Sequence, residues 1–228
     1  CLPALVAVAA YASFSSNAGG ATIISEDFNA GQNSNLTGYD SFTLGGGVIR
    51  RNGSCSNSND RRYIRTVDSD YNTVDFRYEL TYTTSFLSQT SINFIGIGSG
   101  DRRPGGSFGH NEPWESLFFR IHTPNVDGGA VGLGDHPATN IAGLGSIPTA
   151  GVHRARIEKS GSAITFSIDA HYNGDFVADL SHTFPDLSQV APFLDTTNSR
   201  LFFGTVFPDD SFDDMNVVPE PSTLALAA

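Results

Sequence analysis

Cysteine and lysine are nearly absent from this sequence. Its 228 residues include two cysteines, Cys1 and Cys55, and one lysine, Lys159. Two cysteines are too few for a disulfide-stapled domain or for the usual four-ligand zinc module. Acidic residues outnumber Lys and Arg by 24 to 13, for a formal net charge of −11 at pH 7. A chain this acidic repels phosphate backbones, so nucleic acid is excluded as a partner.

The sequence also lacks an apolar run of about 20 residues, the length that spans a bilayer as a helix. Its most apolar stretch, from Leu2 to Phe14, is uncharged and is followed by the small residues Gly19 and Ala21. A short apolar run before a small-x-small pattern is typical of a secretory signal. Because the basic start of such a signal is missing, residues 1–21 are predicted to be a truncated signal peptide. A buried structural segment and a lipid-modified Cys1 are the alternatives.

Export would leave Cys55 as the single cysteine of the mature chain. It lies in the polar run 52–60, whose composition is typical of a surface loop. A lone thiol in an exported protein is either free or paired between two molecules. We therefore expect an exposed thiol, with a Cys55–Cys55 bridge as one route to self-association.

Apolar and polar residues alternate repeatedly between residues 22 and 217. In the clearest run, residues 75–82, one face carries Phe76, Tyr78, Leu80 and Tyr82. The same alternation recurs in residues 153–158 and 163–170. A period of two predicts half-buried antiparallel strands, and no helical stripe competes with it.

Shorter apolar runs predict further strands. They cover residues 22–28, 92–97, 116–122, 200–206 and 212–218. Turn residues separate the runs: Ser160-Gly161 marks one turn, and Asn173-Gly174 suits a type I′ hairpin. Many short strands with such turns predict an all-β fold, a single antiparallel β-sandwich over residues 22–217.

Finer details resemble a known fold family. The domain opens on Glu26-Asp27-Phe28 and closes on the strand 212–217, and residues 154–176 form a charged strand, a turn and an apolar strand. This arrangement resembles the concanavalin A-like and laminin-G-like sandwiches of lectins and glucanases. The resemblance implies a jelly roll in which the first and last strands lie side by side.

Residues 218–228 carry a more specific motif. Val218-Pro219-Glu220-Pro221 precedes a short apolar run, and its two prolines hold an extended segment. The motif resembles the sorting signal of PEP-CTERM proteins, truncated here before the membrane helix and the Arg-rich tail. The resemblance implies sorting by an exosortase. It also implies a secreted protein at the cell surface, or in the extracellular polysaccharide matrix, of a Gram-negative bacterium.

Catalytic carboxylates are sparse. Retaining glucanases use two carboxyl groups about 5–5.5 Å apart, and the resemblance implies a Glu-x-Asp-x-x-Glu strand motif that this sequence does not contain. The nearest pair, Glu112 and Glu115, has the odd spacing that places residues on opposite faces of a strand. A Gly-x-Ser-x-Gly elbow is missing too. We expect no catalysis; a glycoside hydrolase or lyase is the alternative.

Acidic residues gather at both ends of the predicted domain. Glu26 and Asp27 belong to its first strand, and Asp213 and Asp214 to its last. If these strands are neighbours, the four carboxylates and nearby carbonyls can supply the six to eight oxygens that calcium takes. The resemblance implies a structural calcium at the same place. Solvated acidic residues in an acidic chain are the alternative.

A Gly-rich loop over residues 98–115 surrounds the single tryptophan with polar side chains. Sugar sites combine a flat aromatic face with amide, carboxylate or guanidinium groups. The residues predicted to bind carbohydrate are Arg102, Arg103, His110, Asn111, Glu112 and Trp114. The alternative is a flexible loop with Trp114 in the core or at its rim.

Together these observations predict an exported, non-catalytic sandwich that binds polysaccharide or adheres to another matrix component. A structural matrix protein that self-associates through exposed strand edges is the alternative from a different class.

Overall fold

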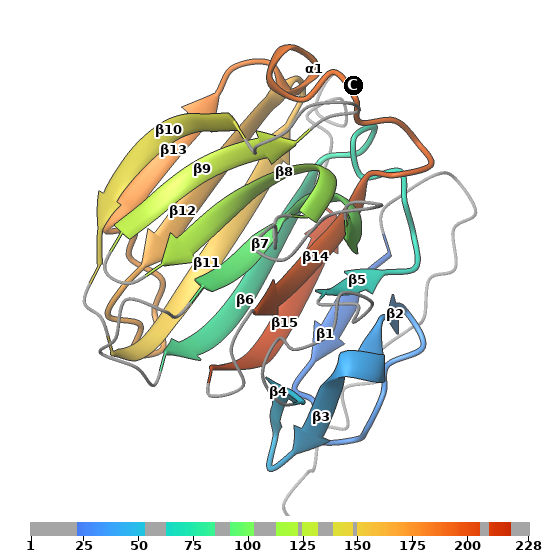
Figure 1. Cartoon of the computed structure of the whole chain (residues 1–228), viewed down its shortest axis with the longest axis vertical. Coiled ribbons are helices and arrows are strands. Elements are labelled where there is room, and N and C mark those ends of the chain that lie inside the picture. The colour runs from blue at the N-terminus through green and yellow to red at the C-terminus, as the bar shows by residue number, and fades with distance from the viewer. Residues whose placement is uncertain are drawn as a thin grey trace, which may run out of the picture.

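The computed structural model describes residues 22–52, 63–84, 92–102, 113–122, 125–131, 139–147, 150–205 and 210–219. These residues form two antiparallel sheets, one of eight strands and one of seven, which confirms the predicted all-β sandwich. In Figure 1 the seven-stranded sheet lies in front of the eight-stranded one. None of the helices in these ranges is long and apolar enough to cross a membrane.

The eight-stranded sheet has the order β13-β12-β11-β6-β15-β4-β3, with β1 also paired to β15. Its strands are β1 (Ile24–Glu26), β3 (Phe42–Gly45), β4 (Val48–Arg51), β6 (Phe76–Thr84), β11 (Gly151–Ser160), β12 (Ala163–Asp169), β13 (Leu180–Phe184) and β15 (Ser211–Pro219). β11 and β12 form a hairpin that turns at Gly161, as predicted, and the φ of 57° at this position favours glycine.

The seven-stranded sheet has the order β10-β9-β8-β7-β14-β5-β2. Its strands are β2 (Leu36–Thr37), β5 (Tyr63–Thr66), β7 (Ile92–Arg102), β8 (Pro113–His122), β9 (Asn125–Val131), β10 (Thr139–Ser146) and β14 (Arg200–Thr205). Two short helices, the 3-10 turn η1 (Tyr39–Ser41) and α1 (Leu187–Val190), lie in the connections.

The core fills the space between the two sheets. On β6, the four residues predicted to share a face are all buried, and so are the corresponding residues of β12. Opposite them lie the inward residues of the second sheet, such as Leu117, Phe119 and Phe203. The ring of Phe119 meets that of Phe166 edge-on across the sandwich, with centroids 4.9 Å apart. The alternation in the sequence therefore located the core correctly.

The first and last strands are neighbours, as the resemblance implied. β1 pairs with β15 in antiparallel register, with Ile24 opposite Val217 and Glu26 opposite Met215. On its other side β15 pairs with β6 as far as Pro219, which lies opposite Phe76. The last strand thus extends two residues beyond the predicted domain boundary.

The prediction of a tight type I′ turn at Asn173-Gly174 was wrong. β12 ends at Asp169 and β13 begins at Leu180, so a longer connection joins them. Gly174 has a positive φ of 123°, but Asn173 is not among the residues with positive φ, and a type I′ turn needs positive φ at both. The Asp169 carboxylate holds this connection by accepting hydrogen bonds from the backbone nitrogens of His171 and Val177.

His153 of β11 is fully buried, and burial favours the neutral imidazole. Its Nδ1 lies 2.8 Å from the carbonyl oxygen of Ala170 and must donate to it, since a carbonyl only accepts. Nε2 then accepts from the Thr84 hydroxyl at 3.1 Å. Burial lowers the pKa of His153 below its usual 6.5, and His171 acts in the same direction while Asp169 opposes it.

Acid should therefore weaken the fold through His153. Because its pKa is lower in the folded state, the unfolded chain binds the proton first as the pH falls through 6.5. Stability is complete above that pH and declines below it. We expect the melting temperature to fall between pH 7 and pH 5, and to fall less in His153→Gln. Parallel profiles for both proteins would contradict this assignment.

Candidate functional site

Both ends of the predicted Gly-rich loop, residues 98–115, belong to strands. β7 continues to Arg102 and β8 begins at Pro113, so Trp114 and Glu115 lie in a strand and not in a loop. The two strands are out of simple register here: Gly98 pairs with Ser116, and Asp101 with Trp114. Two residues of β7 thus face one residue of β8, which is a β-bulge. Bulges re-aim side chains and are common next to functional sites.

This bulge fixes the backbone of Trp114. Its carbonyl oxygen accepts hydrogen bonds from the hydroxyls of both Ser99 and Ser116. The next residue, Glu115, has a φ of 44°, a conformation that is uncommon for a residue with a side chain and costs about 1–3 kcal/mol. Glu115 is held there by Asn198, whose amide donates to Oε2 at 3.0 Å. The half-buried Trp114 is thus placed by a strained but well-anchored backbone.

An aromatic layer lies beside Trp114 on the outer face of the seven-stranded sheet. Its residues alternate along the strands with the core residues, so their side chains face away from the other sheet. Its members are Tyr63, Phe94, Phe118 and Phe202, all buried, with Trp114 packed against them. Phe94 meets both Tyr63 and Phe118 edge-on, with centroids 5.9 and 5.6 Å apart. The layer gives Trp114 a rigid base.

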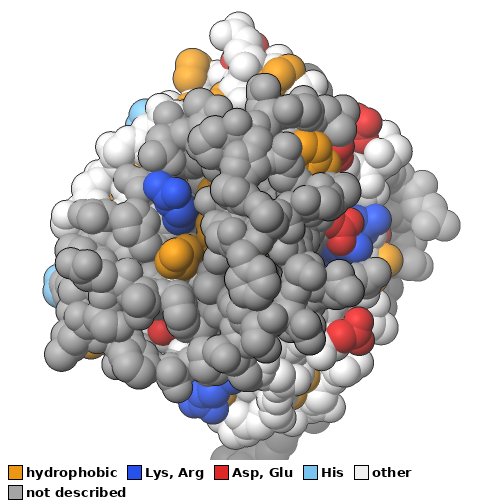
Figure 2. All heavy atoms as spheres, viewed as in Figure 1, with side chains coloured by type: hydrophobic (Ala, Val, Ile, Leu, Met, Phe, Trp, Pro, Cys, Tyr) orange, Lys and Arg blue, Asp and Glu red, His pale blue; other side chains and the backbone are white. Residues whose placement is uncertain are grey.

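Charged groups border this layer. Arg65 forms an ion pair with Asp101, with 2.5 Å between Nη1 and Oδ1, and also donates to the carbonyl oxygen of Ser99 at 2.7 Å. The pair therefore lies at the bulge that carries Trp114. Figure 2 views the molecule from this side and shows both charge signs among the described side chains. An aromatic ring next to a carboxylate and a guanidinium is the combination that sugar sites use.

Most of the predicted sugar-binding residues lie outside the described part of the chain. Trp114 is described in full and Arg102 in its backbone alone; Arg103, His110, Asn111 and Glu112 fall outside. The prediction from the sequence did not include Arg65, Ser99, Asp101 or the aromatic layer. A signal was present, because Phe118-Phe119 and Phe202-Phe203 are apolar at consecutive positions. In a strand this pattern indicates that both faces are covered.

Each of the four residues predicted to hold calcium has a hydrogen-bond or ion-pair partner within the protein. Glu26 is committed to the protein, since its two oxygens accept from the backbone nitrogen of Phe28 and the amide of Asn33. Asp214 forms an ion pair with Arg154. Burial, together with the nearby Asp214 and Asp27 carboxylates, raises the pKa of Asp213. Among the described residues, no three His, Cys, Asp or Glu side chains are arranged to hold a metal.

Similarities to known proteins stand at the level of the fold. No protein-family model and no curated protein matches the chain. Among solved structures, a CBM2 module of an evolved Dit protein from Lactobacillus casei BL23 phage J-1 matches with a TM-score of 0.53 at 13% identity, over 86% of this chain and 96% of that one.

Two further structures match in the same range. The metal-free exoplasmic/lumenal domain of VIP36 has a TM-score of 0.56 at 11% identity, over 86% of this chain and 91% of that one. GH43B of a Bacteroides ovatus xyloglucan locus has a TM-score of 0.58 at 11% identity, but the 88% of this chain that aligns spans only 40% of that protein. The chain has the antiparallel β-sandwich fold of the concanavalin A-like lectin and glucanase type.

Proposed function

We propose that this chain is a non-catalytic carbohydrate-binding domain whose binding surface centres on Trp114. The observation that carries the proposal is the strained bulge that holds a half-buried tryptophan on a rigid aromatic layer, next to the Arg65–Asp101 ion pair. The tryptophan would stack on the apolar face of a sugar ring, and the charged groups would bind hydroxyls. The predicted residues 102, 103 and 110–112 would complete the site.

Support also comes from similarity. The structures that resemble this fold include a carbohydrate-binding module and the VIP36 domain, which has also been solved with Ca²⁺ and Man2 bound. Glu115 is the one described member of the candidate carboxylate pair. Its carboxylate accepts a hydrogen bond from the amide of Asn198, which agrees with non-catalytic binding. No step of the proposal depends on calcium.

Retention on polysaccharides tests the proposal. The full chain is passed over a panel of immobilised neutral and acidic polysaccharides, once in calcium and once in chelator. We expect retention on at least one polymer in both buffers, and a loss of about tenfold in affinity for Trp114→Ala, which corresponds to roughly 1.4 kcal/mol. Phe176→Ala, at a half-buried aromatic in the connection between β12 and β13 of the other sheet, should bind as the parent does.

Each other outcome has a clear meaning. Failure to bind any polymer would overturn the proposal and favour the self-associating matrix protein. An equal loss of affinity in both variants would mean that the substitutions act through the stability of the fold and not through the site. Release of new reducing ends from a polymer would favour a glycoside hydrolase. A strict calcium requirement would indicate that a bound ion takes part in the binding of the polymer.

Export and sorting form the second part of the proposal. The apolar run in residues 1–21 supports a secretory signal, and the Val-Pro-Glu-Pro motif at 218–221 supports recognition by an exosortase. Both would bring the sandwich to the cell surface or extracellular matrix of a Gram-negative bacterium, where polysaccharide is abundant. The motif's first two residues belong to β15, so the enzyme would meet it directly at the domain boundary.

A further inference from the structure

The entry of the chain into the sandwich is tied to the opposite sheet. Thr22 precedes β1 of the eight-stranded sheet, and its hydroxyl donates a hydrogen bond to the carboxylate oxygen Oδ2 of Asp68. Asp68 follows β5 of the seven-stranded sheet, so this bond joins the two sheets. Thr22 is half-buried. The residue at which the sandwich begins is therefore held next to a carboxylate.

Thr22 is also the residue that the predicted cleavage would expose. The predicted signal peptide, residues 1–21, ends in the small residues Gly19 and Ala21. Hydrolysis of the Ala21–Thr22 peptide bond adds the hydroxyl of a water molecule to the carbonyl carbon of Ala21 and its proton to the nitrogen of Thr22. At neutral pH the new carboxylic acid loses its proton and the new amine gains one. Cleavage thus converts a neutral backbone nitrogen into an ammonium.

This ammonium would form close to Asp68. Three covalent bonds of about 1.5 Å separate the nitrogen of a threonine from its own hydroxyl oxygen. Because that oxygen is hydrogen-bonded to Asp68, the nitrogen of Thr22 lies within about 7 Å of the carboxylate. After cleavage residue 21 no longer restrains the nitrogen, so the attraction between opposite charges can bring it closer.

The carboxylate of Asp68 is available to a cation. Asp68 and Asp70 border an open polar hollow of about 480 Å³, whose other lining residues are Val67, Ser69, Thr73 and Thr196. Within the described ranges, the ion pairs do not include either aspartate. The neighbouring cation, Arg200, donates instead to the backbone carbonyl oxygens of Thr66 and Val67.

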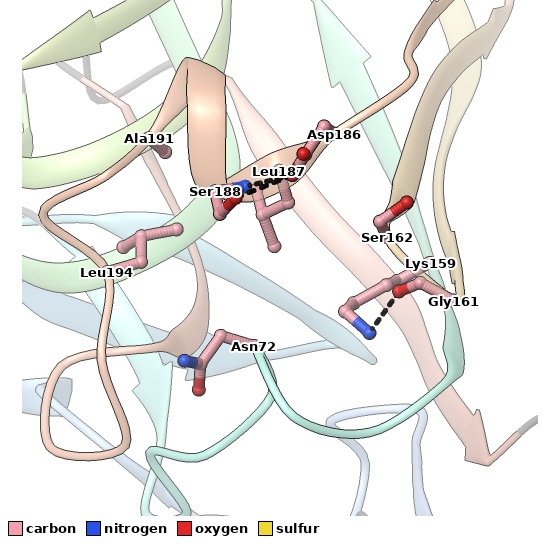
Figure 3. A pocket seen from close by; sticks show the side chains of 9 residues that line it. All are labelled: Asn72, Lys159, Gly161, Ser162, Asp186, Leu187, Ser188, Ala191 and Leu194. Carbon is pink, nitrogen blue, oxygen red and sulfur yellow. Dashed lines mark hydrogen bonds between the residues drawn. The ribbon is translucent and has the colours of Figure 1, made fainter.

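The sequence supplies one other ammonium, that of its single lysine, Lys159. Figure 3 shows this ammonium donating to the carbonyl oxygen of Gly161, at 2.8 Å, and it also donates to Asp75 at 3.4 Å. The side chain of Lys159 is only 6% exposed. Since Lys159 is committed to Asp75, the new α-amino group is the ammonium that remains for Asp68.

We propose that cleavage after Ala21 docks the new N-terminus of Thr22 against Asp68, in an ion pair that joins the two sheets. The inference rests on the proposed export of the chain. Before cleavage the nitrogen of Thr22 is an uncharged amide, so the precursor lacks this ion pair. Removal of the signal would therefore attach the three-residue β1 more firmly to the sandwich.

A controlled cut in the full chain tests the docking. Residues 18–21 are replaced by the recognition sequence of factor Xa, which cuts after its own site and leaves Thr22 as the first residue. We expect the melting temperature at about pH 6 to rise by about 1–4 °C on cleavage, the usual effect of one ion pair in a domain of this size. Asp68→Asn should remove the rise. Asp40→Asn, at an exposed aspartate of η1, should retain it.

The pH dependence of the rise identifies the group that causes it. An ion pair raises the pKa of an α-amino group in the folded state, so its stabilisation is complete below the usual pKa and is lost as the pH rises through the raised one. The rise should therefore vanish at about pH 10.5, where the amine is neutral. Acetylation of the new amino group should abolish it at about pH 6 as well.

Three results would overturn the inference. They are an unchanged melting temperature on cleavage at about pH 6, a rise that persists in Asp68→Asn, and a rise that persists at about pH 10.5. Because each protein is compared with itself before and after the cut, the loss of the Thr22–Asp68 hydrogen bond in a variant does not enter the difference. The engineered cut also needs no export. A failure of the cell to export the chain would contradict the proposed function and leave this result unaffected.

Discussion

Phe119→Ala should lower the free energy of unfolding by about 3–5 kcal/mol, the usual loss for a large aromatic removed from a core. Phe119 is fully buried on β8, and its ring meets Phe166 of β12 at 90°. It therefore joins the two sheets, and its truncation leaves a cavity between them. Since domains are stable by only about 5–15 kcal/mol, this single change removes at least about a fifth of the total.

Urea unfolding followed by circular dichroism measures this loss. Phe119→Leu should cost less, because a branched apolar side chain fills part of the space. Val177→Ala, at an exposed position, should change stability by less than about 0.5 kcal/mol. A loss under about 1 kcal/mol for Phe119→Ala would mean that the ring does not pack between the sheets.

Glu79→Leu should cost about 3 kcal/mol, because it removes a partner from a buried guanidinium. The side chain of Arg154 is 5% exposed, and Glu79 accepts from its Nη2 at 2.9 Å. The other oxygen of Glu79 accepts from Nε of Arg156 at 2.6 Å. After the change Arg154 keeps Asp214, which is itself half exposed, and the hydroxyl of Thr81 at 2.8 Å. These groups compensate a buried charge only in part.

A double variant separates the charge from the packing. Glu79→Leu with Arg154→Met removes both charges, and replacing a buried pair by apolar residues is often nearly neutral. We expect the double variant to recover at least half of the loss in urea unfolding. Arg156→Ala, whose side chain is 23% exposed, should cost clearly less than Glu79→Leu. A double variant that is less stable than Glu79→Leu alone would show that the pair stabilises the fold through its own contacts.

The architecture could be predicted because the alternation of apolar and polar residues along a strand is a local pattern, and this pattern indicates which side chains are buried. A residue such as Leu80 is apolar between two polar neighbours, and that pattern alone assigns its face. When two adjacent residues are both apolar, as Phe202 and Phe203 are, the pattern does not indicate which of them faces the core. The outer aromatic layer was therefore not predicted. Both faces of that sheet are covered, and the covering of the second face depends on the tertiary structure.

The same limit applies to Arg154. Alternation placed it on the outer, solvated face of β11, and it does face outward. Yet it is buried, partly because the connection between β12 and β13 folds back: the Arg154 guanidinium lies 5.0 Å from the ring centroid of Tyr172, and that of Arg156 lies 3.7 Å from Phe176. A single strand's pattern contains no information about a segment that returns from 18 or more residues away.

The candidate site was located only in part. Trp114 was identified because sugar recognition favours aromatic residues among polar ones. Its strand, the bulge and Arg65 were not identified, since register depends on which residues two strands place opposite each other. Turn residues gave a mixed result: Gly161 is a turn glycine as predicted, whereas Gly174 belongs to a longer connection.

The pairing of β1 with β15 determines how this domain responds to mechanical force. Ile24 lies opposite Val217, so the chain enters and leaves the sandwich at the same end, side by side. Pulling these two ends apart opens a three-residue strand one pair at a time, which needs little force. A load applied along β15 instead acts on the β15–β6 ladder, which runs from Ser211 to Pro219 and must slip as a unit. Held at Pro219, the domain would resist a pull along β15 far better than a pull on its own N-terminal strand.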